Sequence, residues 1–445
     1  MVSTMEFQDV HLQPDSRMYL SLAEGIIRYG SFSYPTTPEI PDAERMPGYP
    51  LFLAGVLSLF GGSLLSVVVI QILIDSLSCV LIYRLGETLW KGGGLICGLL
   101  AGVNIGMMTY SHFVLSDSLF LLLFLVVLTL VLEFLRKPRW LTSAMLGTGI
   151  GVATLIRPVM VYFPLVLIPF LFLYLTFNLN VSWGIGAGKV ALCLVLMFGV
   201  LLPWMARNHV HYGRYRLTAQ AGEHLLQYIV PFTWQYSKGI PFIEGMKRAN
   251  LAFDKEAQAA ASHVDFSNPF EKSDFQVKMA LGYLKEEPKS AIIKAWLFGM
   301  TKNLFAPAII DLSYLLKIER PHFFYTGGKT LYERGITFLR SLKGWFGFAV
   351  LANMTVLLLA RLIQVWGLIL LMKAKIWEGT LFFLTIAYFL LVSGPVGYAK
   401  YRLPLEPVLI ILLGIGMADL YLRLFQNRRL ELTGERDSSG APATR

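Results

Sequence analysis

Charged residues are scarce in this sequence. They make up 15% of its 445 residues, against roughly 25% in a soluble domain, while hydrophobic residues make up 55% and the mean hydropathy is +0.57. A soluble fold of this length needs more polar side chains than the chain has to cover its surface. The composition therefore excludes an ordinary soluble protein and predicts that much of the surface faces lipid.

Cysteines and nucleotide-binding motifs are also scarce. The three cysteines, Cys79, Cys97 and Cys193, lie in apolar runs without metal-ligand spacing, so they predict neither a disulfide framework nor a metal site. No P-loop or G-x-G-x-x-G motif stands between a strand and a helix. The net charge of +10 forms no basic stripe with exposed aromatic residues, so we expect no nucleic-acid partner. The N-terminus lacks a charged region before an apolar one, so we expect no cleavable signal peptide.

Nine apolar segments approach the length of about 20 residues that a helix needs to cross a bilayer. They are residues 64–83, 94–110, 115–135, 140–156, 159–175, 185–205, 345–372, 380–397 and 403–422. Three other apolar stretches, 19–27, 51–60 and 291–310, are too short or too charged to span, and we expect them to lie at the interface. The sequence therefore predicts an all-α polytopic membrane protein, a helical bundle with external juxtamembrane helices.

Lysine and arginine concentrate in alternate short connections between these segments. The residues are Arg84 and Lys91, then Arg136, Lys137 and Arg139, then Lys373 and Lys375, and finally Arg423, Arg428 and Arg429. Because basic residues favour the cytoplasmic side, these connections and the C-terminus are predicted to lie inside. The N-terminal segment and the long stretch from 207 to 343 then lie outside.

The chain is accordingly predicted to divide into five parts. Residues 1–63 form an external loop with an acidic motif and interfacial helices, and 64–206 form a membrane bundle of about six spans. Residues 207–344 form an external segment with an interfacial helix, 345–424 form a second bundle of about three spans, and 425–445 form a disordered cytoplasmic tail.

The first motif with potential chemistry is Q-P-D-S-R-M-Y, which contains Asp15. The residue stands just before a helix that we expect to begin near Met18. Two roles for its carboxylate are open. It can cap that helix, where aspartate accepts N–H bonds, and it can serve as the general base for an acceptor hydroxyl at the outer surface. The two roles are compatible.

A second motif, P-D-A-E-R-M-P-G-Y-P, fixes Arg45 in a loop shaped by two prolines and a glycine. An arginine held there is suited to bind a phosphate with two parallel hydrogen bonds. The alternative is an arginine that contacts lipid headgroups. Glu44 and Tyr49 in the same motif are further candidates.

The outer end of the sixth predicted span carries L-P-W-M-A-R-N-H-V-H-Y, with Arg207, His209 and His211. A histidine spacing of two matches no zinc motif, and basic residues at a helix end are also ordinary membrane anchors. The last predicted span opens with G-P-V-G-Y-A-K-Y-R-L-P. We expect its Tyr398, Lys400 and Arg402 to lie outside, against the charge bias, which favours a functional role such as phosphate binding.

Three ionisable residues lie within or beside predicted spans, where charge is costly and often functional. Asp117 in L-S-D-S-L and Arg157 in L-I-R-P fall at outer span ends. Asp75 lies in the middle of the first predicted span, where we expect it to pair within the bundle.

In this order, the motifs resemble the GT-C superfamily of polytopic glycosyltransferases. The closest likeness is to the branch of dolichyl-phosphate-mannose protein mannosyltransferases and bacterial aminoarabinose transferases, which is similar to glycosyltransferase family 39. The matching pieces are D-S-R-M-Y, R-M-P-G-Y-P-L-F-L-A, L-S-D-S-L, L-I-R-P, L-P-W-M-A-R-N and Y-R-L-P-L-E-P. Each piece alone is weak, but the ordered set extends over most of the chain.

The resemblance implies that the family's catalytic acidic residue is Asp15. The second acidic residue usual beside it is Ser16 here, so the paired-acid arrangement is not kept. The resemblance also implies that basic residues of the external loops hold the donor phosphate. The residues in the matching motifs are Arg45, Arg207 and Arg402. Lys400, beside the last of these motifs, is a further candidate for phosphate binding from its position alone. Glu44 and either His209 or His211 resemble partners of a structural metal in some relatives, but we expect no metal or other cofactor to be required.

The function expected from this resemblance is an inverting glycosyltransferase of the bacterial inner membrane, with a polyprenyl-phosphate sugar as donor and its active site on the outer face. The acceptor is a lipid, a glycan or a protein. One carboxylate is evident, whereas retaining enzymes usually use two. The alternatives are a secondary transporter or a non-catalytic membrane protein. Family members begin with a spanning helix before the acidic loop, so we expect in-frame upstream sequence to encode one.

Overall fold

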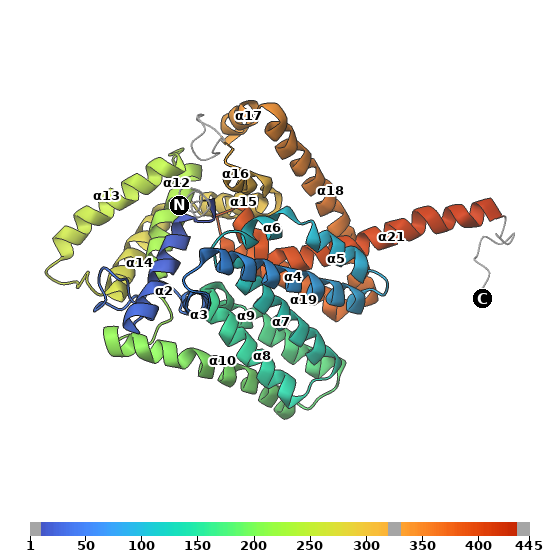
Figure 1. The fold of residues 1–445 in the computed structure, drawn as a ribbon, viewed down its shortest axis with the longest axis horizontal. Coiled ribbons are helices and arrows are strands. Elements are labelled where there is room, and N and C mark those ends of the chain that lie inside the picture. Colours follow the sequence, from blue (N-terminus) through green and yellow to red (C-terminus); the bar gives the residue numbers. More distant parts are fainter. Residues whose placement is uncertain (1–9, 319–330, 434–445) are drawn as a thin grey trace.

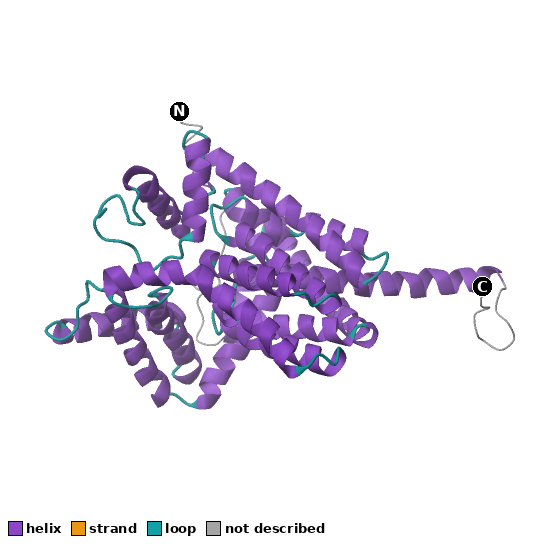
Figure 2. Ribbon diagram, turned by 90° about the horizontal axis from the view of Figure 1, so that it is seen from below, coloured by secondary structure: helices purple, strands orange, loops and turns teal. Residues whose placement is uncertain are grey.

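The computed structural model describes residues 10–318 and 331–433. Within these ranges the chain forms helices and connecting loops, apart from one isolated bridge between Ser33 and Pro41 (Figure 2). The predicted all-α fold is therefore confirmed.

Seven helical segments in the described ranges are long and apolar enough to cross a membrane. They are α4 (Leu64–Leu89), α7 (Asp117–Arg136), Pro158–Asn178, α10 (Trp183–Tyr212), α18 (Gly344–Ala374), α19 (Ile376–Ser393) and Ala399–Leu424. Pro158–Asn178 joins η1 (Pro158–Tyr162), α9 (Pro164–Leu173) and η2 (Tyr174–Asn178), and Ala399–Leu424 joins α20 (Ala399–Arg402), η5 (Leu403–Leu405) and the first part of α21 (Glu406–Thr433). The protein is thus a multi-pass membrane protein.

The other two predicted spans are also helical. The second is broken into α5 (Gly94–Gly102) and α6 (Ile105–Ser111), which are bent by 51°. Asn104 starts α6, because its side chain accepts a hydrogen bond from the Met107 N–H at 3.0 Å. The fourth, α8 (Trp140–Ile156), has 17 residues and is shorter than the seven long segments.

Small residues let the membrane helices pack closely. A Cβ atom on Gly147 of α8 would lie 2.0 Å from the Cys193 carbonyl oxygen of α10, and one on Gly367 of α18 would lie 2.0 Å from the Leu412 carbonyl oxygen of α21. Such contacts between small residues are typical of helix pairs in membranes, where van der Waals packing replaces the hydrophobic effect.

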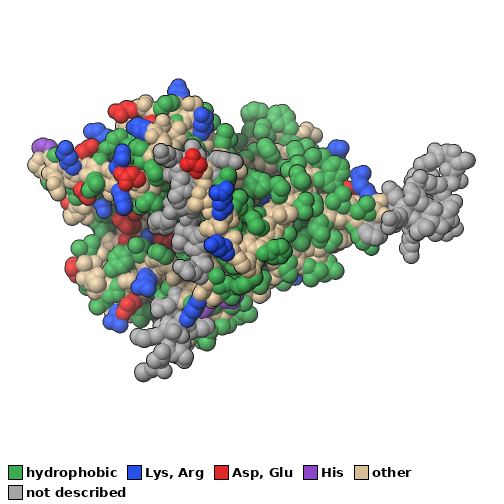
Figure 3. All heavy atoms as spheres, turned by 90° about the horizontal axis from the view of Figure 1, so that it is seen from above, with side chains coloured by type: hydrophobic (Ala, Val, Ile, Leu, Met, Phe, Trp, Pro, Cys, Tyr) green, Lys and Arg blue, Asp and Glu red, His purple; other side chains and the backbone are tan. Residues whose placement is uncertain are grey.

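The segment 207–344, which was predicted to be external, contains a further group of helices. They are α11 (Gln220–His224), η3 (Leu225–Ile229), α12 (Val230–Ser237), α13 (Phe242–Ala260), α14 (Pro269–Glu286), α15 (Lys289–Phe305), α16 (Ile309–Leu315) and α17 (Leu331–Ser341). Figure 1 places α12, α13 and α14 at one end of the molecule and the C-terminal part of α21 at the opposite end. Charged side chains gather over the end that carries α13 and α14, and hydrophobic side chains cover much of the remaining surface in that view (Figure 3).

Two boundary predictions need correction. The first helix, α2 (Pro14–Tyr29), begins at Pro14 and not near Met18, because a proline is favourable in the first turn of a helix. The helix α21 continues to Thr433, so residues 425–433 are helical and not disordered, since no glycine or proline interrupts them. The remaining predicted tail, 434–445, lies outside the described residues.

The two remaining interfacial stretches are short helices. The helix α3 (Gly48–Leu59) has 12 residues, which is too short to cross a bilayer, as predicted. The helix α15 buries a face of small or polar residues, Ala291, Ala295, Gly299 and Asn303, and leaves the large apolar side chains of Ile293 and Leu297 exposed. A Cβ on Gly299 would lie 2.2 Å from the Gly394 carbonyl oxygen, so α15 packs directly on the connection between α19 and α20.

Candidate active site

Asp15 occupies the first turn of α2, inside the helix. The N-cap is Gln13, whose backbone N–H donates to the Ser16 hydroxyl oxygen at 2.9 Å. Ser16 therefore accepts the hydrogen bond of the N-cap residue, and the prediction that Asp15 is the N-cap is wrong. The Asp15 side chain is 39% exposed, and its carboxylate is available to other groups.

Two cations from distant parts of the chain contact this carboxylate. Lys400 Nζ of α20 lies 3.1 Å from Asp15 Oδ2, and Arg45 Nη2 lies 3.4 Å from Asp15 Oδ1. Partial burial alone would raise the pKa of Asp15, but the charges of Lys400 and Arg45 outweigh it and hold that pKa below its ordinary value. Asp15 is therefore an ionised carboxylate at neutral pH.

The loop before α3 holds Arg45 in place. The buried Asp42 carboxylate accepts the Arg45 backbone N–H at 2.8 Å, and the guanidinium lies over the Tyr19 ring at 5.9 Å. A Cβ on Gly48, three residues on, would lie 2.8 Å from the Leu155 carbonyl oxygen, so only glycine lets α3 begin against the end of α8. The Arg45 side chain is 18% exposed and faces Asp15, which favours a site residue over a lipid anchor.

A second ion pair adjoins the first. Arg157, at the end of α8, pairs with Asp117, at the start of α7, and the Asp117 side chain is buried. Lys400 interacts electrostatically with both Asp117 and Asp15. Arg45, Asp15, Lys400, Asp117 and Arg157 therefore form one cluster of alternating charge, which we call the charge cluster. It contains three cations and two carboxylates, so one positive charge is in excess.

The structure does not bring Arg207 to the charge cluster. Its guanidinium donates to the Asp42 carbonyl oxygen at 2.6 Å and to the Phe32 carbonyl oxygen at 3.2 Å, and it lies over the Trp204 ring at 4.6 Å. These contacts fasten the loop of residues 32–42 to α10.

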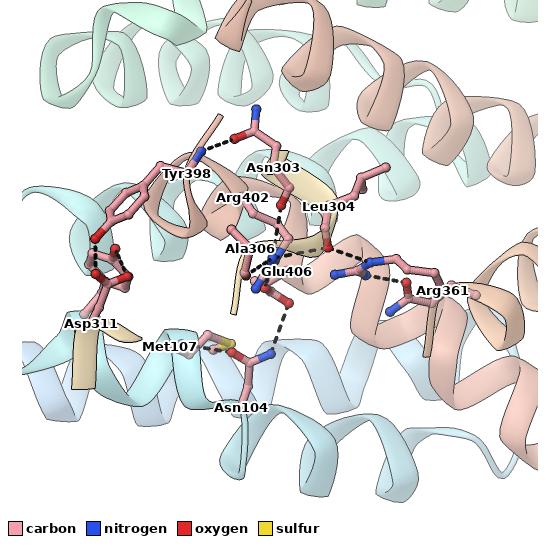
Figure 4. A network of polar contacts seen from close by, with 12 residues as sticks. Asn104, Met107, Asn303, Leu304, Ala306, Asp311, Arg361, Tyr398, Arg402 and Glu406 are labelled. Atoms are coloured by element: carbon pink, nitrogen blue, oxygen red, sulfur yellow. Dashed lines mark hydrogen bonds and ion pairs between the residues drawn. The ribbon is translucent and has the colours of Figure 1, made fainter. Parts of the chain in front are cut away.

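Arg402 is likewise separate from the charge cluster. It is 2% exposed, and its Nε donates to Glu406 Oε1 at 2.6 Å. Its Nη1 donates to the carbonyl oxygens of Asn303 and Ala306 at 3.0 and 2.8 Å (Figure 4). Arg402 therefore ties α20 to the C-terminal end of α15, and it contacts a different part of the chain from Arg207.

The two candidate tyrosines make structural contacts. Tyr49 is fully buried and donates to Gln71 Oε1 at 2.5 Å. Tyr398 and Tyr110 both donate to the buried carboxylate of Asp311 in α16, as Figure 4 shows for Tyr398. The sequence analysis did not single out Asp311, because the motif A-I-I-D-L-S gives no signal that two distant hydroxyls converge on it.

The other candidates also have defined surroundings. His209 stacks on Tyr215 with ring centroids 4.0 Å apart. Asp75 is buried, and its Oδ1 has no hydrogen-bond partner among the described residues, so the expected pairing within the bundle is not observed there. Across residues 10–318 and 331–433, no group of three or more His, Cys, Asp or Glu side chains is arranged to hold a metal ion.

Part of the chain matches the model of a known protein family. Residues 43–205 match the model of the family described as dolichyl-phosphate-mannose-protein mannosyltransferase. The predicted resemblance to GT-C glycosyltransferases is confirmed. The match spans somewhat over a third of the chain and includes Arg45, Asp117 and Arg157. It indicates a membrane glycosyltransferase. Asp15 and Lys400 lie outside the matched residues, and the GT-C likeness of Asp15 rests on the motif around it.

Two solved structures are similar to the chain. One is the archaeal oligosaccharyltransferase AglB from Archaeoglobus fulgidus, in complex with an inhibitory peptide and a dolichol-phosphate, with 12% identity and a TM-score of 0.47 over 95% of this chain. This chain covers 48% of AglB, about half its length. The other is apo ArnT from Cupriavidus metallidurans, with 15% identity and a TM-score of 0.36, covering 93% of this chain and 75% of ArnT. No curated protein matches the chain in sequence.

Proposed function

We propose that the protein is an inverting glycosyltransferase that moves a sugar from a polyprenyl-phosphate donor to an acceptor hydroxyl on the non-cytoplasmic face of the membrane. The observation that carries the proposal is the partly exposed Asp15 carboxylate between Arg45 and Lys400. The family match supports the glycosyltransferase class. The outer-face location rests on the distribution of basic residues along the chain.

In this proposal Asp15 is the general base. An acceptor hydroxyl becomes a good nucleophile when a nearby base removes its proton, and the base must lie within hydrogen-bond reach. Asp15 is ionised and partly exposed, so it meets both the charge and the access requirement. The acceptor oxygen then attacks the anomeric carbon as the bond to the lipid phosphate breaks, which inverts the configuration without a covalent glycosyl-enzyme.

Arg45 and Lys400 are the proposed ligands of the donor phosphate. A polyprenyl-phosphate sugar is a phosphodiester with one negative charge, which would neutralise the single positive charge in excess. Negative charge grows on the phosphate as the sugar leaves, and cations held in place stabilise it. A phosphate that draws the two cations also weakens their hold on Asp15, so donor binding makes Asp15 a stronger base. Arg207 and Arg402 are left out, because main-chain carbonyls engage them.

The test follows a radiolabelled polyprenyl-phosphate sugar in membranes that carry the full chain together with their own acceptors. The proposed transferase moves the label from the polyprenyl phosphate to another molecule, and matched membranes carrying Asp15→Asn move far less. A protein that only transports the donor would leave the label on the polyprenyl phosphate, and this result would remove the proposal.

A further inference from the structure

The helix α11 is fastened directly to the Arg45 loop. The Ala219 backbone N–H donates to the Ala43 carbonyl oxygen at 2.9 Å, and the Thr218 hydroxyl donates to the Glu44 carbonyl oxygen at 2.5 Å. The helix begins at the next residue, Gln220, so Glu223 stands within one helical turn of this attachment.

A second attachment fixes α11 on α14. The Gly222 backbone N–H donates to the Ser273 hydroxyl at 3.0 Å, and a Cβ on Gly222 would lie 2.3 Å from the Ser273 carbonyl oxygen. Because α11 is held at both places, the backbone position of the neighbouring Glu223 is set by the fold.

Glu223 belongs to the surroundings of Asp15. It interacts electrostatically with Glu44, Arg45, Lys272 and Asp15. Burial raises the pKa of Glu223, and the charge of Glu44 acts in the same direction. The carboxylate is half-buried and makes no hydrogen bond or ion pair with the described part of the chain. A carboxylate that is partly desolvated by the fold gains from a ligand that donates hydrogen bonds to it.

Two tyrosines share these surroundings. Tyr228 of η3 interacts electrostatically with Tyr401, Glu223, Asp15 and Arg45. Tyr401 is next to Lys400 in α20, and both tyrosine side chains are partly buried in one hydrophobic cluster. The general base, an unpaired carboxylate and two aromatic side chains therefore lie in the same region, on α2, α11, η3 and α20.

We propose that Glu223 binds the acceptor and that the acceptor is a carbohydrate; this inference rests on the proposed transferase function. A sugar has several hydroxyls, so one is attacked through Asp15 while others donate hydrogen bonds to Glu223. The C–H face of a sugar ring is apolar surface that packs on the tyrosine side chains. A serine or threonine side chain has one hydroxyl, which the reaction uses, so a peptide acceptor could donate to Glu223 only through its main-chain N–H groups and would offer no sugar ring to the tyrosines.

The experiment measures acceptor binding without any donor, so it is independent of the transferase assay. The fluorescently labelled full chain in nanodiscs is applied to an array of immobilised glycans and serine- or threonine-containing peptides. Wild type is expected to be retained on glycan features, and Glu223→Gln is expected to lose at least 10-fold of this retention. Glu286→Gln, a matched change at an exposed residue at the end of α14, is expected to keep it.

Size-exclusion chromatography establishes that the variants are equally folded. Retention on peptides alone, on no feature at all, or equally by wild type and Glu223→Gln would overturn the acceptor inference. None of these outcomes bears on donor cleavage, and absent donor cleavage would overturn the proposed function whatever the array shows.

Discussion

Asp15 and Lys400 are 385 residues apart in the sequence, yet Lys400 Nζ lies 3.1 Å from Asp15 Oδ2. The first described helix and the segment that opens the last described membrane span therefore meet in one ion pair. The Lys400 side chain is 19% exposed, so solvent screens this pair less than a surface salt bridge. The properties of Asp15 consequently depend on a residue that no local motif connects to it.

Replacing Asp15 by asparagine should lower the rate of donor cleavage by about 10²–10⁴-fold, because the amide keeps the shape of the carboxylate but has no useful basicity. The measurement is turnover of a labelled polyprenyl-phosphate sugar at matched folded concentration. Asp254→Asn, on the exposed surface of α13, is the control and should retain the wild-type rate. Equal rates for Asp15→Asn and wild type would show that Asp15 is not the base.

Replacing Lys400 by glutamine should raise the KM for the donor roughly 10- to 100-fold, the loss expected when a charge-assisted hydrogen bond to the phosphate is removed. The change is measured from initial rates over a range of donor concentrations in nanodiscs. Lys255→Gln, at an exposed position of α13, matches the substitution without touching the charge cluster. An unchanged donor KM in Lys400→Gln would argue that the phosphate binds elsewhere.

The loss of activity at low pH should depend on the ion pair between Asp15 and Lys400. Lys400 and Arg45 hold the pKa of Asp15 below its ordinary value, so activity is present above that pKa and is lost as the pH falls through it. In Lys400→Gln the pKa rises, and the acid limb moves to higher pH. The comparison is kcat/KM for the donor, which reports the free enzyme, measured between about pH 2 and 7. An acid limb at the same pH in both proteins would separate Asp15 from the activity.

The free energy of unfolding should fall as the pH rises through the titration of Asp42, whereas the activity rises as Asp15 loses its proton. Burial raises its pKa to about 6, so between about pH 4 and 6 the folded protein keeps a proton that the unfolded chain releases. Stability from this group is therefore lost as the pH rises through that window, by roughly 3 kcal/mol. The apparent Tm of Asp42→Asn in detergent should change less with pH there than that of wild type, since asparagine still accepts the Arg45 N–H. Parallel Tm profiles for the two proteins would contradict this.

The contact between α8 and α10 should tolerate no side chain at Gly147. An added Cβ would meet the Cys193 carbonyl oxygen at 2.0 Å, so Gly147→Ala must push the helices apart, at a cost of about 1–3 kcal/mol. Its apparent Tm should fall by several degrees, measured by thermal unfolding in detergent. Gly199→Ala on α10 has no neighbouring atom within 4 Å and should leave the Tm unchanged. A similar Tm for both variants would mean that this contact does not limit stability.

The membrane helices could be predicted because a span is a local property of about 20 apolar residues. The break between α5 and α6 was missed, since a single Asn104 that caps a new helix barely alters the hydropathy of the segment. Arg45 and Asp15 were identified from motifs, but their pairing with Lys400 and the link to Asp117 and Arg157 depend on tertiary packing. A local sequence pattern does not predict contacts between residues that lie this far apart in the chain.

The predicted phosphate-binding role of Arg402 rested on its position and left out its pairing with Glu406. Its predicted place outside, against the charge bias, favoured phosphate binding, yet its charge is balanced by Glu406 at the i+4 position. That spacing was present in R-L-P-L-E and is typical of pairs within a helix. The external segment gave no motif for Glu223, because its neighbours in space come from α2 and from the Arg45 loop.

The position of Arg402 also has a consequence for biosynthesis. The carbonyl oxygens of Asn303, Leu304 and Ala306 at the end of α15 accept from its guanidinium, and a helix end needs such partners for its last carbonyls. Ribosomes make the chain from the N-terminus, so α15 is synthesised about a hundred residues before the arginine that completes it. The end of α15 therefore gains these partners only after the last described span has been synthesised, and a nascent chain lacking residues 399–424 has no Arg402 to supply them.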